Sequence, residues 1–278
     1  MDGNPCTTDE TCQDGVCGGG THEPMLCEAM LCAQVEAKLV KTTAAPPAGL
    51  VDGLEDGSFH WREPKRSLFC SRASLSGEAS LVKVAEAVDA TPRTIGHPAG
   101  PAHHLSVPVV NRAGDVPVLS RLVLRDRFGT RPVSVRLPSQ GRAARAVSLP
   151  IELSGPSAPT VQTVGARKCY DVRNGRSAGA KRVPLWTDEG EVMLYDIKKL
   201  RRVCVPVSID GRAAPDETAT LACYRAHRSR GGANIPADTP AEVFTGRGDR
   251  IEIGNWNKDF VCFPAEIESH QVRSAPKA

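Results

Sequence analysis

The sequence predicts an all-β fold of tandem small disulfide-stapled β modules with a Cys-rich N-terminal cap. Three observations predict this fold class. Ten cysteines occur without any Cys-x-x-Cys pair, four segments of the chain match one another, and each matching segment has a β-hairpin pattern in its middle. Aromatic residues make up only 4% of the chain, so any core rests on small aliphatic side chains. Small cores of this kind need covalent reinforcement.

The cysteines indicate an oxidising compartment. Their number is even and their spacing fits neither a zinc ribbon nor a thioredoxin-type redox pair. Such cysteines form disulfides in exported proteins, so we expect an extracellular or cell-surface location. Because Met1 precedes Asp2 without a secretory signal, we expect a mature or trimmed form. The expected structural disulfides use Cys6, Cys12, Cys17, Cys27, Cys32, Cys70, Cys169, Cys204, Cys223 and Cys262.

An internal repeat predicts which cysteines pair. Cys32 and Cys70, Cys169 and Cys204, and Cys223 and Cys262 stand 38, 35 and 39 positions apart, whereas the matching segment 104–153 has no cysteine. Loss of both cysteines together is expected if pairing occurs within a unit, because an orphaned thiol is reactive. We therefore predict these three bonds. The alternative joins the end of one unit to the start of the next, for example Cys204 to Cys223.

The repeat divides the chain into segments. They are a Cys-rich cap (1–30), four β units (31–75, 104–153, 167–208 and 221–267), a linker (76–103) and a tail (268–278). Ser80–Ala90 in the linker has apolar residues at helical spacing, although a strand is a nearly equal alternative. We call 31–75, 104–153, 167–208 and 221–267 the first to fourth units.

The middle of each unit has the pattern of a hairpin. In the second unit, Leu122–Leu124 leads through Asp126–Gly129 to Val133–Val135, and the third unit leads from Val183–Trp186 to Val192–Ile197. The fourth unit joins Val243–Phe244 to Ile251–Ile253. Alternating β-branched residues beside turns that contain Asp or Gly favour hairpins. Each unit should therefore hold about four short strands, with the outer two joined by the disulfide.

Several of these motifs resemble a known tandem module. Cys169-Tyr170, Cys223-Tyr224, Cys204-Val205-Pro206 and the Asp126–Thr130 turn are similar to a repeat of uncharacterised secreted proteins from myxobacteria and related bacteria. The segment Asp2–Cys17 resembles one unit of a Cys-rich repeat in large surface proteins of such organisms. The resemblance implies export and a modular architecture, and it implies no chemistry.

Charge and hydropathy exclude two classes of partner. The net charge is only +3, from 35 basic and 32 acidic residues, which gives no reason to expect nucleic acid. No apolar run reaches the length of a membrane span.

Catalytic motifs are weak or missing, so we do not expect an enzyme. Gly175–Gly179 matches the nucleophile-elbow pattern around Ser177, but that motif requires a following helix and a large parallel sheet. A metal site at His97, His103 and His104 is disfavoured against simple loop residues. The acidic residues of the cap do not have the spacing of an EF-hand calcium loop. We expect no metal and no cofactor.

Two sets of residues are candidates for binding. Arg247-Gly248-Asp249 forms an Arg-Gly-Asp tripeptide on an expected hairpin tip, and coincidence is the stronger explanation in a chain so rich in Arg and Gly. Trp61, Trp186 and Trp256 occur once in each Cys-bearing unit, and we favour a role in the core over a sugar-stacking row.

Together these observations predict a non-enzymatic structural or adhesive protein, secreted or at the cell surface. It would act through protein–protein contacts or self-assembly, because regular strand edges can pair with a partner. The alternative is a carbohydrate-binding module of a larger secreted protein.

Overall fold

The described part of the chain is built from β-strands. The structure is a computed structural model, and it describes residues 7–8, 11–13, 16–18, 21–22, 28–41, 48–52, 54, 56–61, 66–75, 103–111, 118–137, 145–152, 166–187, 192–211, 219–229, 241–245 and 250–273. These residues form strands, turns and no helix, so the predicted all-β class is confirmed. Within the described residues, no helix has the length and apolarity needed to cross a membrane. The strands are β1 (Thr7–Thr8), β2 (Thr11–Gln13), β3 (Val16–Gly18), β4 (Thr21–His22), β5 (Glu28–Lys41), β6 (Ala48–Asp52), β7 (Asp56–Trp61), β8 (Arg66–Ser74), β9 (His103–Asn111), β10 (Val118–Asp126), β11 (Gly129–Leu137), β12 (Arg145–Glu152), β13 (Arg167–Asp171), β14 (Val183–Thr187), β15 (Val192–Ile209), β16 (Thr220–Arg228), β17 (Ala241–Thr245) and β18 (Arg250–Arg273).

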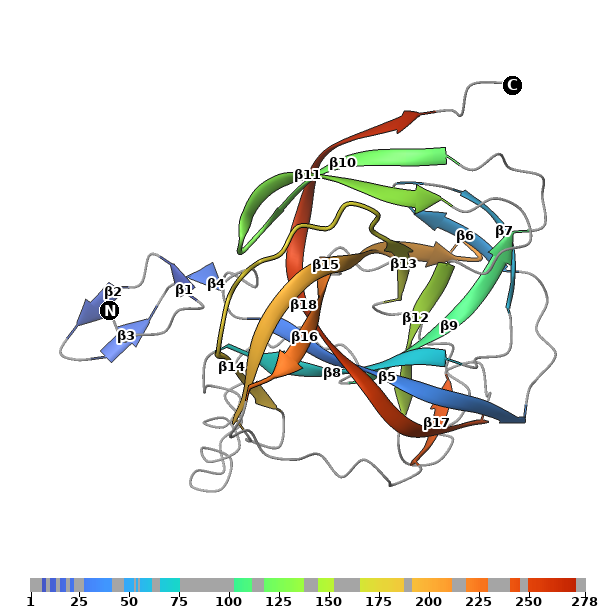
Figure 1. The fold of residues 1–278 in the computed structure, drawn as a ribbon, viewed down its shortest axis with the longest axis horizontal. Coiled ribbons are helices and arrows are strands. Elements are labelled where there is room, and N and C mark those ends of the chain that lie inside the picture. Colours follow the sequence, from blue (N-terminus) through green and yellow to red (C-terminus); the bar gives the residue numbers. More distant parts are fainter. Residues whose placement is uncertain are drawn as a thin grey trace.

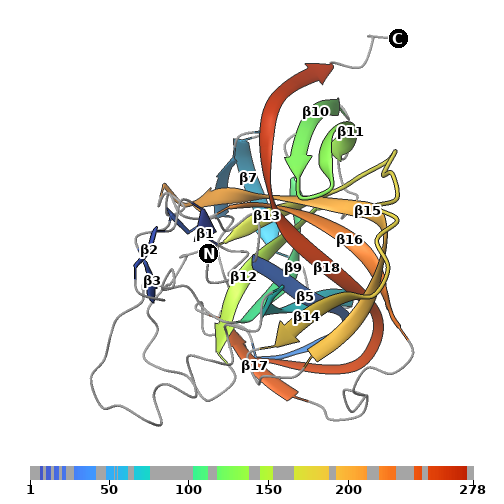
Figure 2. The ribbon, with the colours of Figure 1, turned by 90° about the vertical axis from the view of Figure 1, so that its left-hand side faces the viewer.

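Eight of these strands form a sheet that closes on itself, which we call the cylinder. Each strand is antiparallel to the next in the order β5, β8, β9, β12, β13, β15, β16 and β18, and β18 pairs with β5 to close the ring. The long strands β15 and β18 curve around it (Figures 1 and 2). Closure removes the exposed edges that an open sheet would present.

The cylinder uses the first and last strands of every unit. Strands β6, β7, β10, β11, β14 and β17 lie outside the ring, and β15 and β18 run from their hairpins into it. The outer strands of one unit pair with each other, as β5 does with β8 and β9 with β12. The predicted hairpins are present as β6–β7, β10–β11, β14–β15 and β17–β18.

Each hairpin also pairs with a different unit. Strand β6 pairs with β15, β10 with β18, β14 with β8, and β17 with β12. The sequence led us to expect a small sheet closed within each unit, and the structure instead joins the four units in one continuous sheet. The physical reason is that an isolated hairpin buries little and leaves strand edges that need partners.

Three disulfides lie inside the cylinder. The bonds are Cys32–Cys70, Cys169–Cys204 and Cys223–Cys262, with Cα atoms 3.9 to 4.0 Å apart, and each joins the two cysteines of one unit. The expectation of disulfide bonds is thus confirmed. Their sulfurs come from six strands and belong to one buried cluster, which is possible only in the interior. In the second unit Ser106 and Ser148 are register partners at the corresponding place.

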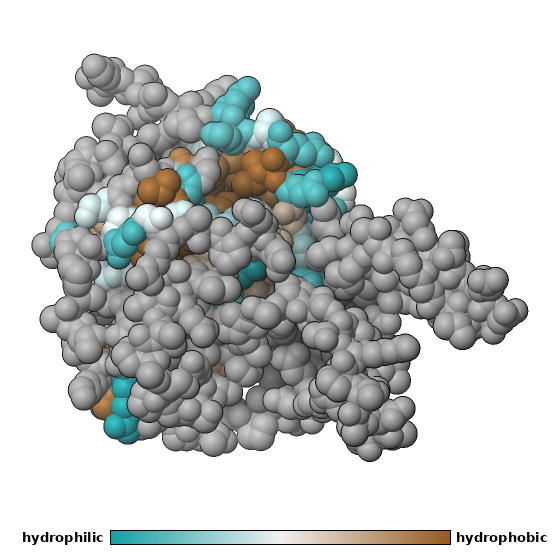
Figure 3. All heavy atoms as spheres, turned by 180° about the vertical axis from the view of Figure 1, so that it is seen from behind, coloured by the Kyte–Doolittle hydropathy of each residue, from teal (hydrophilic) through white to brown (hydrophobic). Residues whose placement is uncertain are grey.

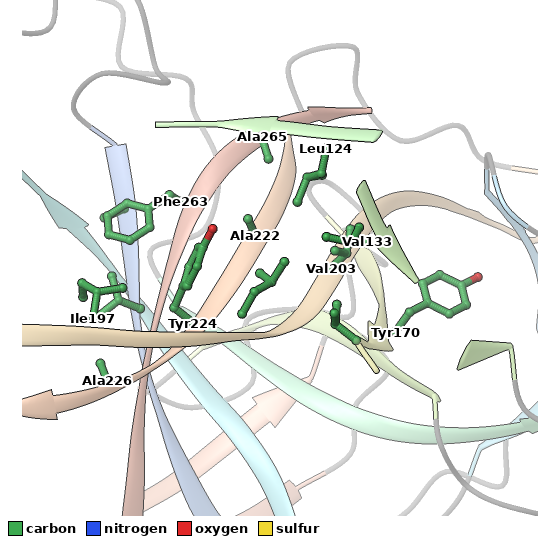
Figure 4. Packing of buried hydrophobic residues seen from close by; sticks show 14 of the residues in the cluster. Leu124, Val133, Tyr170, Ile197, Val203, Ala222, Tyr224, Ala226, Phe263 and Ala265 are labelled. Carbon is green, nitrogen blue, oxygen red and sulfur yellow. The ribbon is translucent and has the colours of Figure 1, made fainter. Parts of the chain in front are cut away.

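The outer face of the cylinder carries the larger hydrophobic core. Because side chains alternate along a strand, the neighbours of the cysteines face outward, among them Tyr170, Val203 and Tyr224. Figure 4 shows Tyr224 between Phe263 and Ala222 in this core. The hairpins cover these side chains, so the four units share their cores.

Two tyrosine–aspartate contacts fasten hairpins to distant strands. The hydroxyl of Tyr170 donates a 2.7 Å hydrogen bond to Asp52, whose Oδ2 also lies 3.3 Å from Nζ of the buried Lys168. The hydroxyl of Tyr224 donates to Asp126, which also pairs with Arg131. These are the tyrosines of the Cys-Tyr motifs, so that motif connects one unit to the hairpin of another.

The two aspartates occupy equivalent positions. Asp52 is the register partner of Val207, and Asp126 is that of Ala265, in each case three residues after the closing cysteine. Each aspartate accepts a hydrogen bond from the backbone N–H two residues ahead, which fixes the turn. In the other two hairpins the same place is held by a threonine, Thr187 or Thr245.

Some expectations fall at or beyond the limits of the described residues. Strand β18 continues to Arg273, so residues 268–273, expected as tail, pair with β10. The expected helix or strand at Ser80–Ala90 lies outside the described residues. In the cap, the structure describes the backbone of β1 to β4, and the register of β2 with β3 places Cys12 opposite Cys17. Cys6 and Cys27 lie outside the described residues.

Candidate functional site

An open pocket of about 350 Å³ lies beside the disulfides, next to the residues that stand two positions from the cysteines along their strands. Several of its lining residues stand two positions from a cysteine on the same strand, and residues at that spacing share a face of a sheet. They are therefore inward-facing residues of the cylinder. The lining of the pocket among the described residues consists of Gln34, Asp171, Val172, Arg201, Arg202, Arg225 and Phe260.

A strand irregularity brings two consecutive arginines to this pocket. In a regular strand Arg201 and Arg202 would point to opposite faces of the sheet. The register of β15 with β16 shifts between Leu200 and Arg202, and such a bulge redirects side chains. The backbone is held there, because the carbonyl of Arg201 accepts a 2.7 Å hydrogen bond from the N–H of Val172.

A close backbone approach supports the same irregularity. At Gly175 an added Cβ would lie 1.8 Å from the carbonyl oxygen of Leu200, so only glycine fits. The segment that contains Gly175 runs along β15 through hydrogen bonds between Leu200 and Arg176 and between Ala178 and Lys198. This segment thereby fixes the stretch of β15 from which the two arginines project.

The pocket carries an excess of positive charge. Nε of Arg202 lies 3.1 Å from Oδ1 of Asp171, and these two groups form an ion pair. The described lining holds two further arginines, Arg201 and Arg225, and no acid besides Asp171. Nε of Arg225 is buried and makes no hydrogen bond to any described residue. A buried donor without an acceptor is costly, and an anionic group in the pocket would satisfy it.

The aromatic residue of the lining is not an open stacking surface. Phe260 is 8% exposed, and the guanidinium of Arg202 lies 5.9 Å from the centre of its ring. A sugar ring stacks on an aromatic face that is free. The arrangement therefore favours recognition of charge, through hydrogen bonds from guanidinium groups, over recognition of a neutral ring.

The tryptophans proposed from the sequence are not brought together. Trp61 is half-buried on β7 and packs against a core cluster. Trp186 is half-buried on β14, which pairs with β8 and β15 and not with β7. The side chain of Trp256 and the tripeptide Arg247-Gly248-Asp249 lie outside the described residues.

The weaker catalytic and metal candidates are separated in space or undescribed. Ser177 is exposed on an extended segment beside Lys199, and strand β14 follows it where a nucleophile elbow requires a helix. His104 is buried in β9, whereas His97 and the side chain of His103 lie outside the description. No group of three or more potential metal ligands occurs among the described residues.

Few large hydrophobic side chains are highly exposed among the described residues. Figure 3 shows hydrophobic residues in the upper part of one face, bordered by hydrophilic ones. The large hydrophobic side chains exposed in the described part are Val40, Val51 and Val192, on three different strands. Single exposed hydrophobic residues are normal and indicate no docking surface.

Sequence reasoning missed the arginine pocket and the two tyrosine–aspartate contacts. A signal existed for the pocket, because Asp171, Arg202 and Arg225 each stand two residues from a cysteine. The bulge that adds Arg201 has no sequence signature. Comparison with protein-family models, with curated proteins and with solved structures finds no match.

Proposed function

We propose that this protein is an extracellular, non-catalytic binding protein that acts through contacts with a protein partner. In this proposal the arginine-lined pocket beside the disulfides holds a carboxylate of that partner. The observation that carries the proposal is the set Arg201, Arg202 and Arg225 around one pocket, with Asp171 as the one acid among its described lining residues. Arginine presents a rigid planar fork of donors that matches a carboxylate.

The three interior disulfides support an extracellular location. Disulfides persist in oxidising compartments and are rare in the cytosol. The shared pairing scheme of the four units supports an origin from one tandem module. The same geometry supports an adhesive role, because a rigid cylinder would hold its arginines in place and lose little conformational entropy on binding.

Strand-edge assembly, the other route to protein contacts, has little support. Both edges of β6, β7, β14 and β17 are paired along at least part of their length. Strand β11 pairs with β10, and beside its other edge Ser134 accepts a hydrogen bond from Arg173. Among the described hairpin strands, β11 is therefore the one at the end of the sheet, and its outer edge is bridged only near Ser134 and Val135.

The test is binding of acidic probes to the intact oxidised protein. A glutamate-rich peptide, polygalacturonate and neutral dextran are titrated by calorimetry at low ionic strength. We expect the peptide to bind, and Arg225→Gln to weaken it by about tenfold, the effect of about 1.4 kcal/mol. Arg121→Gln, which changes an exposed arginine of β10 outside the pocket, is the matched control and should bind like the parent.

Each outcome decides between the candidates. If polygalacturonate binds and the peptide does not, the ligand is an acidic carbohydrate and not a protein. That result would favour the alternative of a carbohydrate-binding module. Equal losses in Arg225→Gln and Arg121→Gln would show general charge attraction and overturn the pocket. Absence of binding to either acidic probe would overturn the proposed function.

A further inference from the structure

The three disulfides form one continuous series of sulfur atoms. Sγ of Cys32 lies 3.7 Å from Sγ of Cys262, which belongs to the next disulfide. Sγ of Cys204 lies 3.9 Å from Sγ of Cys223, so the third disulfide also contacts the second. Read along these contacts, the order is Cys70–Cys32, Cys262–Cys223 and Cys204–Cys169.

The stagger of the cylinder produces these contacts. Between units the register is shifted, so that Cys262 is the partner of Met30 and Cys32 is the partner of Phe260. The same shift makes Cys204 the partner of Leu221. The disulfides of neighbouring units are therefore displaced by one inward-facing layer and meet diagonally.

The cysteine-less second unit gives the series two ends. Cys70 lies opposite His104 in that unit, and Cys169 lies opposite Ala146 in that unit. Cys70, the end at which the attack is proposed, is the most exposed of the six cysteines, and Cys204 is as exposed as Cys169, at 4%. Cys70 and Cys169 have exposed fractions of 6% and 4%, while Cys32 is fully buried at 0%.

We propose that the three bonds exchange as a relay when a dithiol reductant attacks at Cys70. A thiolate of the reductant attacks Sγ of Cys70, and Cys32 leaves as a thiolate. The second thiol of the reductant then releases Cys70, and the reductant becomes a cyclic disulfide. Exchange proceeds by attack of a thiolate on a neighbouring disulfide sulfur. Two electrons have entered the protein at this point.

The later steps move the free thiolate through the interior. The Cys32 thiolate attacks Sγ of Cys262, a new bond forms, and Cys223 leaves as a thiolate. The Cys223 thiolate attacks Sγ of Cys204 and releases Cys169, which takes up a proton. The product has bonds Cys32–Cys262 and Cys204–Cys223, with thiols at Cys70 and Cys169. The net change is one disulfide reduced, with two electrons and two protons gained.

The relay provides redox control of the binding pocket, and this part rests on the proposed function. Gln34, Asp171 and Arg225 each stand two residues from a cysteine of the series. Replacing bonds within units by bonds between units shifts the strands that carry these side chains. We expect the two-thiol form to bind the glutamate-rich peptide at least several-fold more weakly than the oxidised form.

Partial reduction followed by peptide mapping tests the relay without any ligand. The folded protein is treated with limiting dithiothreitol, trapped with iodoacetamide after acid quenching, and the species with two alkylated cysteines is isolated. We expect alkylation at Cys70 and Cys169 in most of that species. Alkylation at the two members of one original disulfide would overturn the proposal, whichever disulfide it is.

A matched variant checks that the middle bond carries the exchange. In Cys223→Ser with Cys262→Ser the series is interrupted, so the alkylated pair should be Cys32 with Cys70 or Cys169 with Cys204. Persistent alkylation of Cys70 with Cys169 in this variant would contradict a relay through the middle bond. If the variant does not fold, the map of the parent protein still decides. A parent map that shows the relay together with absent peptide binding would refute only the proposed function.

Discussion

Replacing Tyr224 by Phe tests how strongly a buried contact holds the hairpin β10–β11 on the cylinder. The Tyr224 hydroxyl donates to Asp126 and receives a hydrogen bond from Arg131. The Asp126 side chain is fully buried, and that of Arg131 is 10% exposed. The substitution removes the hydroxyl from a site that water hardly reaches.

The expected cost follows from the charge of the acceptor. A hydrogen bond to a charged group contributes about 1.5–3 kcal/mol, so Tyr224→Phe should lower the free energy of unfolding by about that amount. Asp126→Asn should cost more, about 3–5 kcal/mol, because it leaves the Arg131 charge buried without its partner. The double variant should cost less than the sum, since both changes remove the same contact.

Urea unfolding of the oxidised protein, followed by circular dichroism, measures these differences. Arg125→Gln is the matched control, because Arg125 precedes Asp126 on β10. Both side chains of its ion pair with Glu266 are about half exposed, so the pair should contribute only about 0–1 kcal/mol. If Tyr224→Phe destabilised the protein no more than Arg125→Gln, the buried contact would not be a stabilising link between the units.

Three further predictions concern the second unit, the pocket and pH. Ser106→Cys with Ser148→Cys should form a further disulfide inside the cylinder, because the two positions are register partners like the three cysteine pairs there. The bond should raise the free energy of unfolding in urea by about 4 kcal/mol. Free thiols in the oxidised double variant would contradict the shared pairing scheme. Gly175→Ala should lower the free energy of unfolding by about 1–3 kcal/mol and weaken peptide binding, because the new Cβ would clash with the Leu200 carbonyl. An unchanged midpoint of urea unfolding would refute this prediction. Burial raises the pKa of Asp259, so the native state retains that proton longer than the unfolded state, and stability should fall as pH rises through the raised pKa. Asp259→Asn should remove this slope in a pH series of unfolding measurements, and a slope that persisted would contradict the assignment.

The sequence was sufficient to predict features that depend on local pattern. The hairpin at Asp126–Gly129 was predicted because alternating β-branched residues flank a turn that the Asp126 side chain and Gly129 at φ 101° favour. The pairing of Cys169 with Cys204 was also accessible, because spacing within a repeat is visible without a structure. Both depend on residues close in sequence or on repeated spacing.

The sequence was insufficient where a strand pairs with a strand that is distant in the chain, because no motif identifies that pairing. Nothing local indicates that the hairpin with Asp52 pairs with β15 of the third unit, because strand addition depends on main-chain groups that every residue shares. Once that pairing is known, the residues are consistent with it. Tyr170 and Tyr224 face hairpins that carry an aspartate. The pocket was missed for the same reason, since Arg225 gains its neighbours only when the cylinder closes.

The pairing of the six cysteines of the cylinder within their units is the central claim, because the order of the sulfur series depends on it. The most direct measurement is a peptide map of the native protein, digested without reduction under acidic conditions that prevent exchange. The account predicts the linkages Cys32–Cys70, Cys169–Cys204 and Cys223–Cys262. Free thiols at these positions, or native linkage of Cys204 to Cys223, would contradict it.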